Sequence, residues 1–163
     1  MCKFNAETVT MSKIWTIEPD LVKINDFNKN TMIEFLDIQF TKYDDDALYA
    51  TMPVNERTIQ SYGILHGGAS VVLAETVGSV ASIHCVDPEK FRVVGLEINC
   101  NHIRATRDGL ITCVAKPKHT GRTTQVWEMT LYNEEQKITA ISRMTCSVVN
   151  IDRIKLRSEV AKD

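Results

Sequence analysis

The chain has 163 residues, a formal net charge of −2 and 44% hydrophobic residues. This length fits one domain, which can bury roughly two-thirds of the surface of its unfolded chain. The small net charge provides no overall basic field of the kind that nucleic-acid-binding domains use, so no nucleic-acid partner is expected.

The ends of the chain are expected to lie outside the packed domain. We expect a disordered N-terminal segment at 1–15, a domain over 16–151 and a polar C-terminal tail at 152–163. The first residues contain neither the apolar segment nor the cleavage signature of an export signal, and a start at Met11 fits as well as one at Met1. The five cysteines are odd in number and include no Cys-x-x-Cys pair, which favours reduced thiols and a cytoplasmic protein.

The N-terminal part of the domain predicts a short helix followed by a hairpin. Pro19 suits the first turn of a helix over about 18–27, and its apolar side would be formed by Leu21, Val22, Ile24 and Phe27. Apolar and polar residues then alternate over 35–43 and over 48–54, the two-residue period of half-buried strands. The three aspartates at 44–46 separate the two strands, which predicts an antiparallel hairpin.

The stretch 62–87 predicts a long helix that begins at the glycine-rich turn His66-Gly67-Gly68. Its apolar residues lie on every side rather than along one stripe, which is the pattern of a helix surrounded by protein. Polar residues interrupt it too often for a membrane span, so no membrane partner is expected. We therefore expect a core helix wrapped by strands.

Two chemical features lie on this helix. The backbone N–H groups at Gly67 and Gly68, with the positive end of the helix dipole, form a site for negative charge. Glu75 is the only formally charged side chain between Arg57 and Asp87, and in apolar surroundings it would act as a base or nucleophile. Because Glu75 follows Gly67 by eight residues, the two are about 12 Å apart along the axis and about 80° apart around it. They can serve one substrate only if a second copy of the helix is present, which predicts a homodimer.

The two-residue period returns after Pro88 and continues to the end of the domain. Strands are predicted over about 94–100, 111–115, 126–131 and 138–148, with short turns between them, and successive strands joined by short turns favour antiparallel pairing. Two strands, a long buried helix and four more strands predict the hotdog arrangement. This is an α+β fold in which one antiparallel sheet wraps around a central helix.

The stretch GILHGGASVVLAETVGSVAS resembles the PaaI-like hotdog thioesterases, and the likeness continues through FLDIQF, ALYATMPV, VVGLEINCNHIR and QVWEMTLY. It covers most of the chain from about residue 31 to residue 148. The motif is most similar to the branch that hydrolyses 1,4-dihydroxy-2-naphthoyl-CoA in menaquinone synthesis. The resemblance implies an acyl-CoA substrate, no separate cofactor because coenzyme A is part of the substrate, a site between two subunits, and a homotetramer.

The resemblance also implies roles for individual residues. Glu75 matches the catalytic carboxylate, as nucleophile or general base, and Gly67 matches the backbone donor that stabilises the oxyanion. His66 and Gln60 match residues that orient the thioester carbonyl and the water. Ser79 matches a hydroxyl on the carboxylate side.

A second set of residues is expected to bind the substrate. Its members near the helix are Gly68, Thr76, Asn101 and His102. The others belong to a basic turn around His119 that could hold the phosphates of coenzyme A, namely Lys116, Lys118 and Arg122.

Each feature also has a purely structural interpretation. Glu75 would then be a carboxylate capped by the hydroxyls of Thr76 and Ser79, His66 a helix-start residue, and the basic turn a solvated loop. The histidines and cysteines lack the spacing of a metal site, so no metal is expected.

The sequence predicts hydrolysis of an aromatic or other bulky acyl-CoA. A broad-range housekeeping acyl-CoA thioesterase is one alternative. A hydratase or dehydratase on the same fold and a non-catalytic acyl-CoA-binding module are the others.

Overall fold

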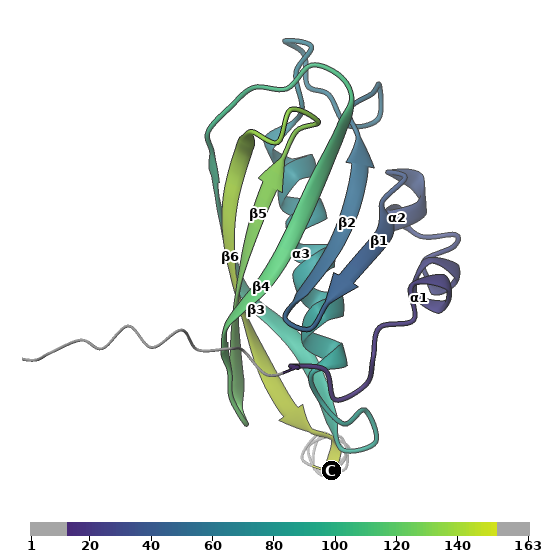
Figure 1. Cartoon of the computed structure of the whole chain (residues 1–163), viewed down its shortest axis with the longest axis vertical. Coiled ribbons are helices and arrows are strands. Elements are labelled where there is room, and N and C mark those ends of the chain that lie inside the picture. Colours follow the sequence, from purple (N-terminus) through teal and green to yellow (C-terminus); the bar gives the residue numbers. More distant parts are fainter. Residues whose placement is uncertain (1–12, 153–163) are drawn as a thin grey trace, which may run out of the picture.

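The computed structural model describes residues 13–152, and in it a six-stranded antiparallel sheet curves around a long helix (Figure 1). The elements in chain order are α1 (Leu21–Phe27), α2 (Met32–Phe35), β1 (Gln39–Asp44), β2 (Ala47–Pro53), α3 (Gly67–His84), β3 (Phe91–His102), β4 (Leu110–Thr120), β5 (Thr124–Tyr132) and β6 (Ile138–Asn150). The strand order across the sheet is β1-β2-β4-β5-β6-β3. The predicted hotdog fold is confirmed.

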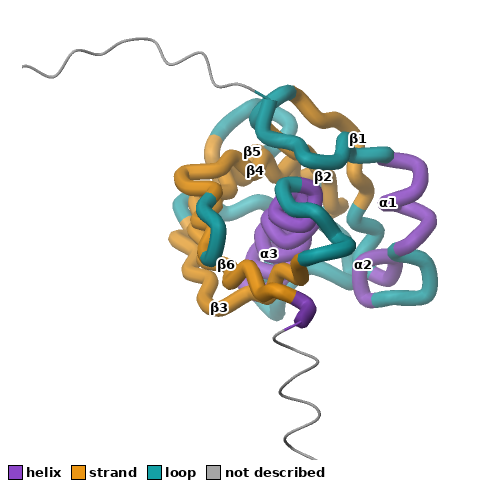
Figure 2. The backbone as a smooth tube through the Cα atoms, turned by 90° about the horizontal axis from the view of Figure 1, so that it is seen from below, coloured by secondary structure: helices purple, strands orange, loops and turns teal. Residues whose placement is uncertain are grey.

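The core lies between α3 and the concave face of the sheet, as the view from one end of the molecule shows (Figure 2). One face of α3 is buried there, including Leu73, Val77 and Gly78. A Cβ added to Gly78 would lie 3.0 Å from Met144 Cε and 3.1 Å from Met129 Sδ. The helix and the sheet therefore approach closely at Gly78, where a larger residue would require the two methionine side chains to shift.

The pairing of β3 differs from the simple succession of strands that the short turns favoured. β3 pairs with β6 at one edge of the sheet, and β4 pairs with β2. The segment 103–109 therefore carries the chain from the edge back to the middle of the sheet. Because α3 crosses the concave face before β3 begins, the chain re-enters the sheet at the edge opposite to the β1–β2 hairpin.

The N-terminal elements depart from the prediction in detail. Asp20 is the N-cap of α1, so Pro19 lies before the helix rather than in its first turn. Val22 and Phe27 are 71% and 88% exposed, so the predicted apolar side is wrong for both. A helix of two turns can pack only a narrow stripe of side chains against the core. In α1 this stripe consists of Leu21 and Ile24.

The strand predicted from residue 35 begins at Gln39 instead. A short helix, α2, precedes it, and the Thr31 hydroxyl caps this helix by accepting the Ile33 N–H at 3.2 Å. Asp37, with φ of 55°, then turns the chain into β1. Ile38 and Phe40 are buried, as the alternation predicted. The burial was therefore predicted correctly, whereas the predicted start of the strand was wrong.

The packed structure reaches further toward the N-terminus than the expected boundary at residue 16. Trp15 is 8% exposed, and its indole Nε1–H donates to the Asp44 carbonyl at 2.8 Å. Residues 1–12 and 153–163 of the expected terminal segments lie outside the described part.

The four described cysteines are Cys85, Cys100, Cys113 and Cys146, and all are free thiols, as predicted. Burial raises the pKa of each thiol, that of Cys85 to about 12. Over residues 13–152, no helix combines the length and the apolar character that crossing a membrane requires.

Candidate active site

The start of α3 is shaped by the side chain of His66. His66 is the N-cap residue, and its Nδ1 accepts the Gly68 N–H at 2.8 Å. A neutral imidazole that accepts through Nδ1 carries its proton on Nε2, so the Nε2–H is available as a donor. Because the Gly68 N–H is already used, the predicted anion site is reduced to the Gly67 N–H, a first-turn donor without an intrahelical acceptor.

A pocket of about 300 Å³ opens at Gly67. Its lining residues are Gln60, Ile64, Leu65, Gly67, Ser70, His102, Ile103, Arg104, Ala105 and Thr139. Gln60 Oε1 accepts the Tyr62 N–H at 2.9 Å, which leaves the Nε2 donors of this amide for a ligand. The Gly67 pocket therefore gathers a backbone donor, an amide donor and the imidazole of His102.

A second pocket, of about 390 Å³, contains Glu75. Its lining residues are Met32, Ile33, Val72, Glu75, Thr76, Ser79 and Val80. Glu75 is exposed, and its side chain forms no recorded hydrogen bond or ion pair within residues 13–152. A Cβ added to Gly95 of β3 would lie 3.7 Å from Glu75 Oε1, so the carboxylate lies beside the edge strand. The Glu75 carboxylate, surrounded by mainly apolar side chains and two hydroxyl groups, can therefore contact a bound ligand and react with it.

The exposure of Glu75 corrects two expectations. In one chain α3 is not surrounded on every side, because the residues that face away from the sheet are open, Ile83 among them at 47% exposure. The expected capping of the Glu75 carboxylate by hydroxyl groups is also absent among residues 13–152. The Ser79 hydroxyl instead lies 4.0 Å from Met144 Sδ.

The Gly67 pocket and the Glu75 pocket share no lining residue. Within one chain the structure therefore does not bring the backbone donor and the carboxylate together, in agreement with their eight-residue separation along α3.

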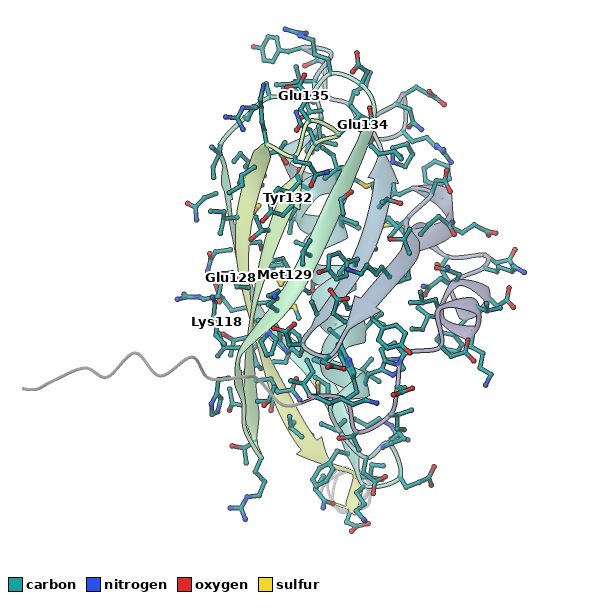
Figure 3. The ribbon with its side chains drawn as sticks, in the orientation of Figure 1. Lys118, Glu128, Met129, Tyr132, Glu134 and Glu135 are labelled. Carbon is teal, nitrogen blue, oxygen red and sulfur yellow. The ribbon has the colours of Figure 1, made fainter. Side chains whose placement is uncertain are left out.

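The remaining predicted binding residues are scattered. Thr76 lines the Glu75 pocket and His102 the Gly67 pocket, whereas Asn101 is exposed on β3 and lines neither. Lys116 Nζ lies 3.2 Å from Asp46 Oδ2. Lys118 Nζ lies 2.8 Å from Glu128 Oε1, and both of these residues are labelled in Figure 3.

The basic turn is distant from the Gly67 of its own chain. β4 begins beside Pro53, at the end of the sheet where the loop into α3 starts, and runs to Thr120 at the opposite end. The turn that contains Arg122 follows there, between β4 and β5.

Sequence reasoning missed several residues that line the two pockets. Ser70, Arg104 and Thr139 surround Gly67, and their separation along the chain gave no local signal. Met32 and Ile33 wall the Glu75 pocket, and they belong to the short helix that the sequence did not reveal.

Comparison with known proteins places these features in a family context. Residues 62–140 match the family model described as "Thioesterase superfamily". The 1,4-dihydroxy-2-naphthoyl-CoA hydrolase of Escherichia coli K12 is 46% identical over 136 residues, which cover 83% of this chain and 99% of that protein. The proofreading thioesterase EntH of Cronobacter turicensis is 41% identical over 136 residues, 83% of this chain and 98% of that protein.

A solved structure is similar over the same region. It is the crystal structure of a mutant thioesterase from Pseudomonas aeruginosa. That structure superimposes with a TM-score of 0.83 and 47% sequence identity, covering 85% of this chain and 99% of the other.

Proposed function

Because the chain belongs to the thioesterase superfamily and is a thioester hydrolase, we propose that it hydrolyses acyl-CoA esters with an aromatic or other bulky acyl group, at a site formed by two subunits. The name of the Escherichia coli relative makes 1,4-dihydroxy-2-naphthoyl-CoA the first candidate. The reaction uses no separate cofactor, since coenzyme A is part of the substrate.

One observation carries the two-subunit proposal: Gly67 and Glu75 open into separate pockets of the same chain. In a two-fold dimer each pocket of one subunit can face the complementary pocket of the other. Each dimer then contains two equivalent sites, each with Gly67 from one subunit and Glu75 from the second.

The surface of the single chain supports this pairing. β3 is an edge strand whose Val94 and Leu96 are 53% and 66% exposed, and an edge with apolar side chains is a surface for strand pairing. Glu75 lies beside this edge, so pairing of β3 with a second copy would cover the open face of α3. We also expect two such dimers to form a homotetramer.

In the proposed mechanism the thioester carbonyl oxygen accepts a hydrogen bond from the Gly67 N–H, which is held in place before negative charge develops. Gln60 and the Nε2–H of His66 orient the carbonyl and the water. In one route, Glu75 of the second subunit takes a proton from water as the water oxygen bonds to the carbonyl carbon; the carbon–sulfur bond then breaks, and the thiolate of coenzyme A takes that proton. In the other route, Glu75 attacks the carbonyl carbon itself and the carbon–sulfur bond breaks to give an acyl-glutamyl anhydride; water then hydrolyses the anhydride and supplies the proton of the thiol.

The walls of the Glu75 pocket support the proposed preference for a bulky acyl group. Met32, Ile33, Val72 and Val80 provide apolar contact area on the acyl side of the carboxylate. Thr76 and Ser79 add hydroxyl groups that can contact polar substituents.

The phosphates of coenzyme A are proposed to bind at the basic turn of Lys116, Lys118 and Arg122. Both lysines are in ion pairs on the protein surface, and exposed pairs of this kind contribute little energy. A phosphate can therefore displace their carboxylate partners. His102 and Asn101 are placed near the thioester end of the ligand.

A thiol-release assay with a panel of aromatic and aliphatic CoA esters tests this function. We expect the highest kcat/KM for a bulky aromatic ester. A flat profile would instead favour the housekeeping thioesterase, and binding of CoA esters without release of thiol would favour the non-catalytic module.

A further inference from the structure

A groove of about 500 Å³ lies between α1 and the C-terminal half of α3. Its walls include Ile17, Ile24, Phe27, Asn28, Val80 and Ile83. We call it the α1 groove. Its surface is mainly apolar, so an apolar group would gain free energy by binding there.

One side-chain nitrogen beside the α1 groove, Asn28 Nδ2, has no hydrogen-bond partner within residues 13–152. Asn28 is only 9% exposed, and its Nδ2 is buried without a hydrogen-bond acceptor among the residues that the structure describes. The hydrogen bonds that Asn28 forms at the end of α1 come from its backbone and not from its side chain. Its N–H donates to Asn25 O at 3.3 Å, and its carbonyl accepts from Thr31 Oγ1 at 2.6 Å. A buried amide donor without an acceptor is costly. Because Asn28 Nδ2 has almost no accessible surface, the side-chain amide must turn toward the α1 groove before a ligand oxygen can accept from it.

The α1 groove continues the Glu75 pocket. Val80 lines both. Along α3, Val80 lies about 7.5 Å and Ile83 about 12 Å beyond Glu75, on the side of the helix that the sheet leaves open. An acyl group whose thioester carbon lies at Glu75 must therefore extend past a single ring to enter the groove.

We propose that the α1 groove receives the distal part of an extended acyl group, and that Asn28 Nδ2 donates a hydrogen bond to an oxygen near the far end of that group. The inference rests on the proposed function and narrows its substrate class. Asn28 is thereby a specificity residue and takes no part in the chemistry.

Filling the groove tests its occupancy. Ile83→Trp places a larger side chain in it, so kcat/KM for dodecanoyl-CoA should fall about tenfold while that for benzoyl-CoA stays within about twofold, since a loss of about 1.4 kcal/mol of binding corresponds to a factor of ten. Val22→Trp is the matched control, because Val22 is exposed on α1 and does not line the groove. An equal fall for both esters, or no fall for either, would overturn the proposal. So would a change of oligomeric state in Ile83→Trp, since the groove would then hold protein rather than an acyl group.

A second experiment isolates Asn28. A series of straight-chain acyl-CoA esters, with and without a terminal hydroxyl, should contain one chain length at which the hydroxylated ester is preferred about fivefold, the factor that one neutral hydrogen bond provides. Asn28→Leu should abolish this preference and keep the activity on the plain esters. Persistence of the preference in Asn28→Leu, or its absence from the whole series in the wild-type protein, would refute the assignment.

Failure of the proposed function would look different from failure of this inference. In that case the wild-type protein would release no thiol from any ester, or Glu75→Gln would retain full activity on benzoyl-CoA. Failure of the inference alone leaves the Glu75-dependent hydrolysis of benzoyl-CoA in place.

Discussion

The imidazole of His102 lies against Gly67, such that a Cβ on this glycine would stand 2.9 Å from Nε2 and 3.2 Å from Cε1. The contact joins the start of α3 to the end of β3, and a larger residue would fit only if His102 moved. Glycine at position 67 thus keeps its N–H accessible to a ligand and leaves His102 in place.

Gly67→Ala retains the backbone N–H, but its methyl group displaces His102 and narrows the pocket, so the carbonyl oxygen reaches the donor poorly. The variant should therefore lower kcat/KM by up to about 10²- to 10³-fold, the loss expected when one oxyanion donor is no longer used. Its thermal midpoint should change little, since His102 is exposed and can move aside. Steady-state kinetics with the double variant Gly67→Ala/His102→Ala separate the two causes. If displacement of His102 is the cause, Gly67→Ala should have little further effect in the His102→Ala background. Full activity of Gly67→Ala would contradict the need for a residue without a side chain at this position.

Glu75→Gln should lower kcat by about 10²- to 10⁴-fold, the contribution expected of a general base. Stability should be unaffected, because the exposed carboxylate forms no recorded contact within residues 13–152 that the amide would lose. Thiol release and thermal unfolding measure the two effects. Glu89→Gln, at another exposed glutamate, is the control and should resemble the wild type. A Glu75→Gln protein with near-normal turnover would remove Glu75 from the mechanism.

Two substitutions of His66 separate capping from catalysis. His66→Ala removes the acceptor of the Gly68 N–H and should reduce the free energy of unfolding by about 1 kcal/mol. Asparagine also caps helices, so His66→Asn should restore that stability. If the Nε2–H orients the substrate, His66→Asn should remain impaired in kcat at least tenfold. Recovery of both stability and activity in His66→Asn would limit this residue to capping.

Mixing of inactive variants tests whether two subunits share the site. Gly67→Val and Glu75→Gln should each be inactive alone, yet a mixed dimer contains one site with both native residues. After random exchange of subunits, about a quarter of the wild-type activity should return, as a two-fold dimer requires. Each variant incubated with itself is the control. If the mixture stays inactive although mixed dimers are detected by mass, each site belongs to a single chain.

Tyr49 should govern part of the alkaline stability. Its hydroxyl donates to Asp44 Oδ2 at 2.7 Å, and burial, followed by this hydrogen bond, raises the pKa of Tyr49 from 10.0 to about 12. The resulting stability is present below pH 10 and is lost as the pH rises toward 12, because the unfolded chain ionises first. Urea unfolding at pH 9 and pH 11.5 should therefore show a smaller alkaline loss for Tyr49→Phe than for the wild type, whereas the exposed Tyr62→Phe should show the wild-type loss. Equal losses in all three proteins would contradict the raised pKa.

Much of the fold could be predicted because strands that are buried on one face show a regular alternation of apolar and polar residues in the sequence. The alternation along β2, β4, β5 and β6 matches their buried and exposed positions, and the glycine-rich start of α3 lies where the turn predicted it. The separation of Gly67 from Glu75 could be predicted too, since it depends only on the helical rise.

Other features have no such signal. The four residues of α2 are too few to show a helical period, and alternation alone does not say which strand is the neighbour of β3. Val72 and Val80 on the open face of α3 resemble core residues in composition, so the sequence did not reveal that one chain leaves this face uncovered. An apolar side chain meant for a second subunit or a ligand looks the same in sequence as one meant for the core.

The two short helices before β1 have a consequence for how such an enzyme can diversify. The proposed reacting groups lie on α3 and the loop before it, whereas α1 and α2 line the α1 groove and the Glu75 pocket. Replacing residues 13–36 by those of a homologue would thus change the walls that contact the acyl group, while Gly67 and Glu75 would stay the same. A lineage could change its substrates through two short helices while the residues that anchor them to the core, such as Trp15, stay the same.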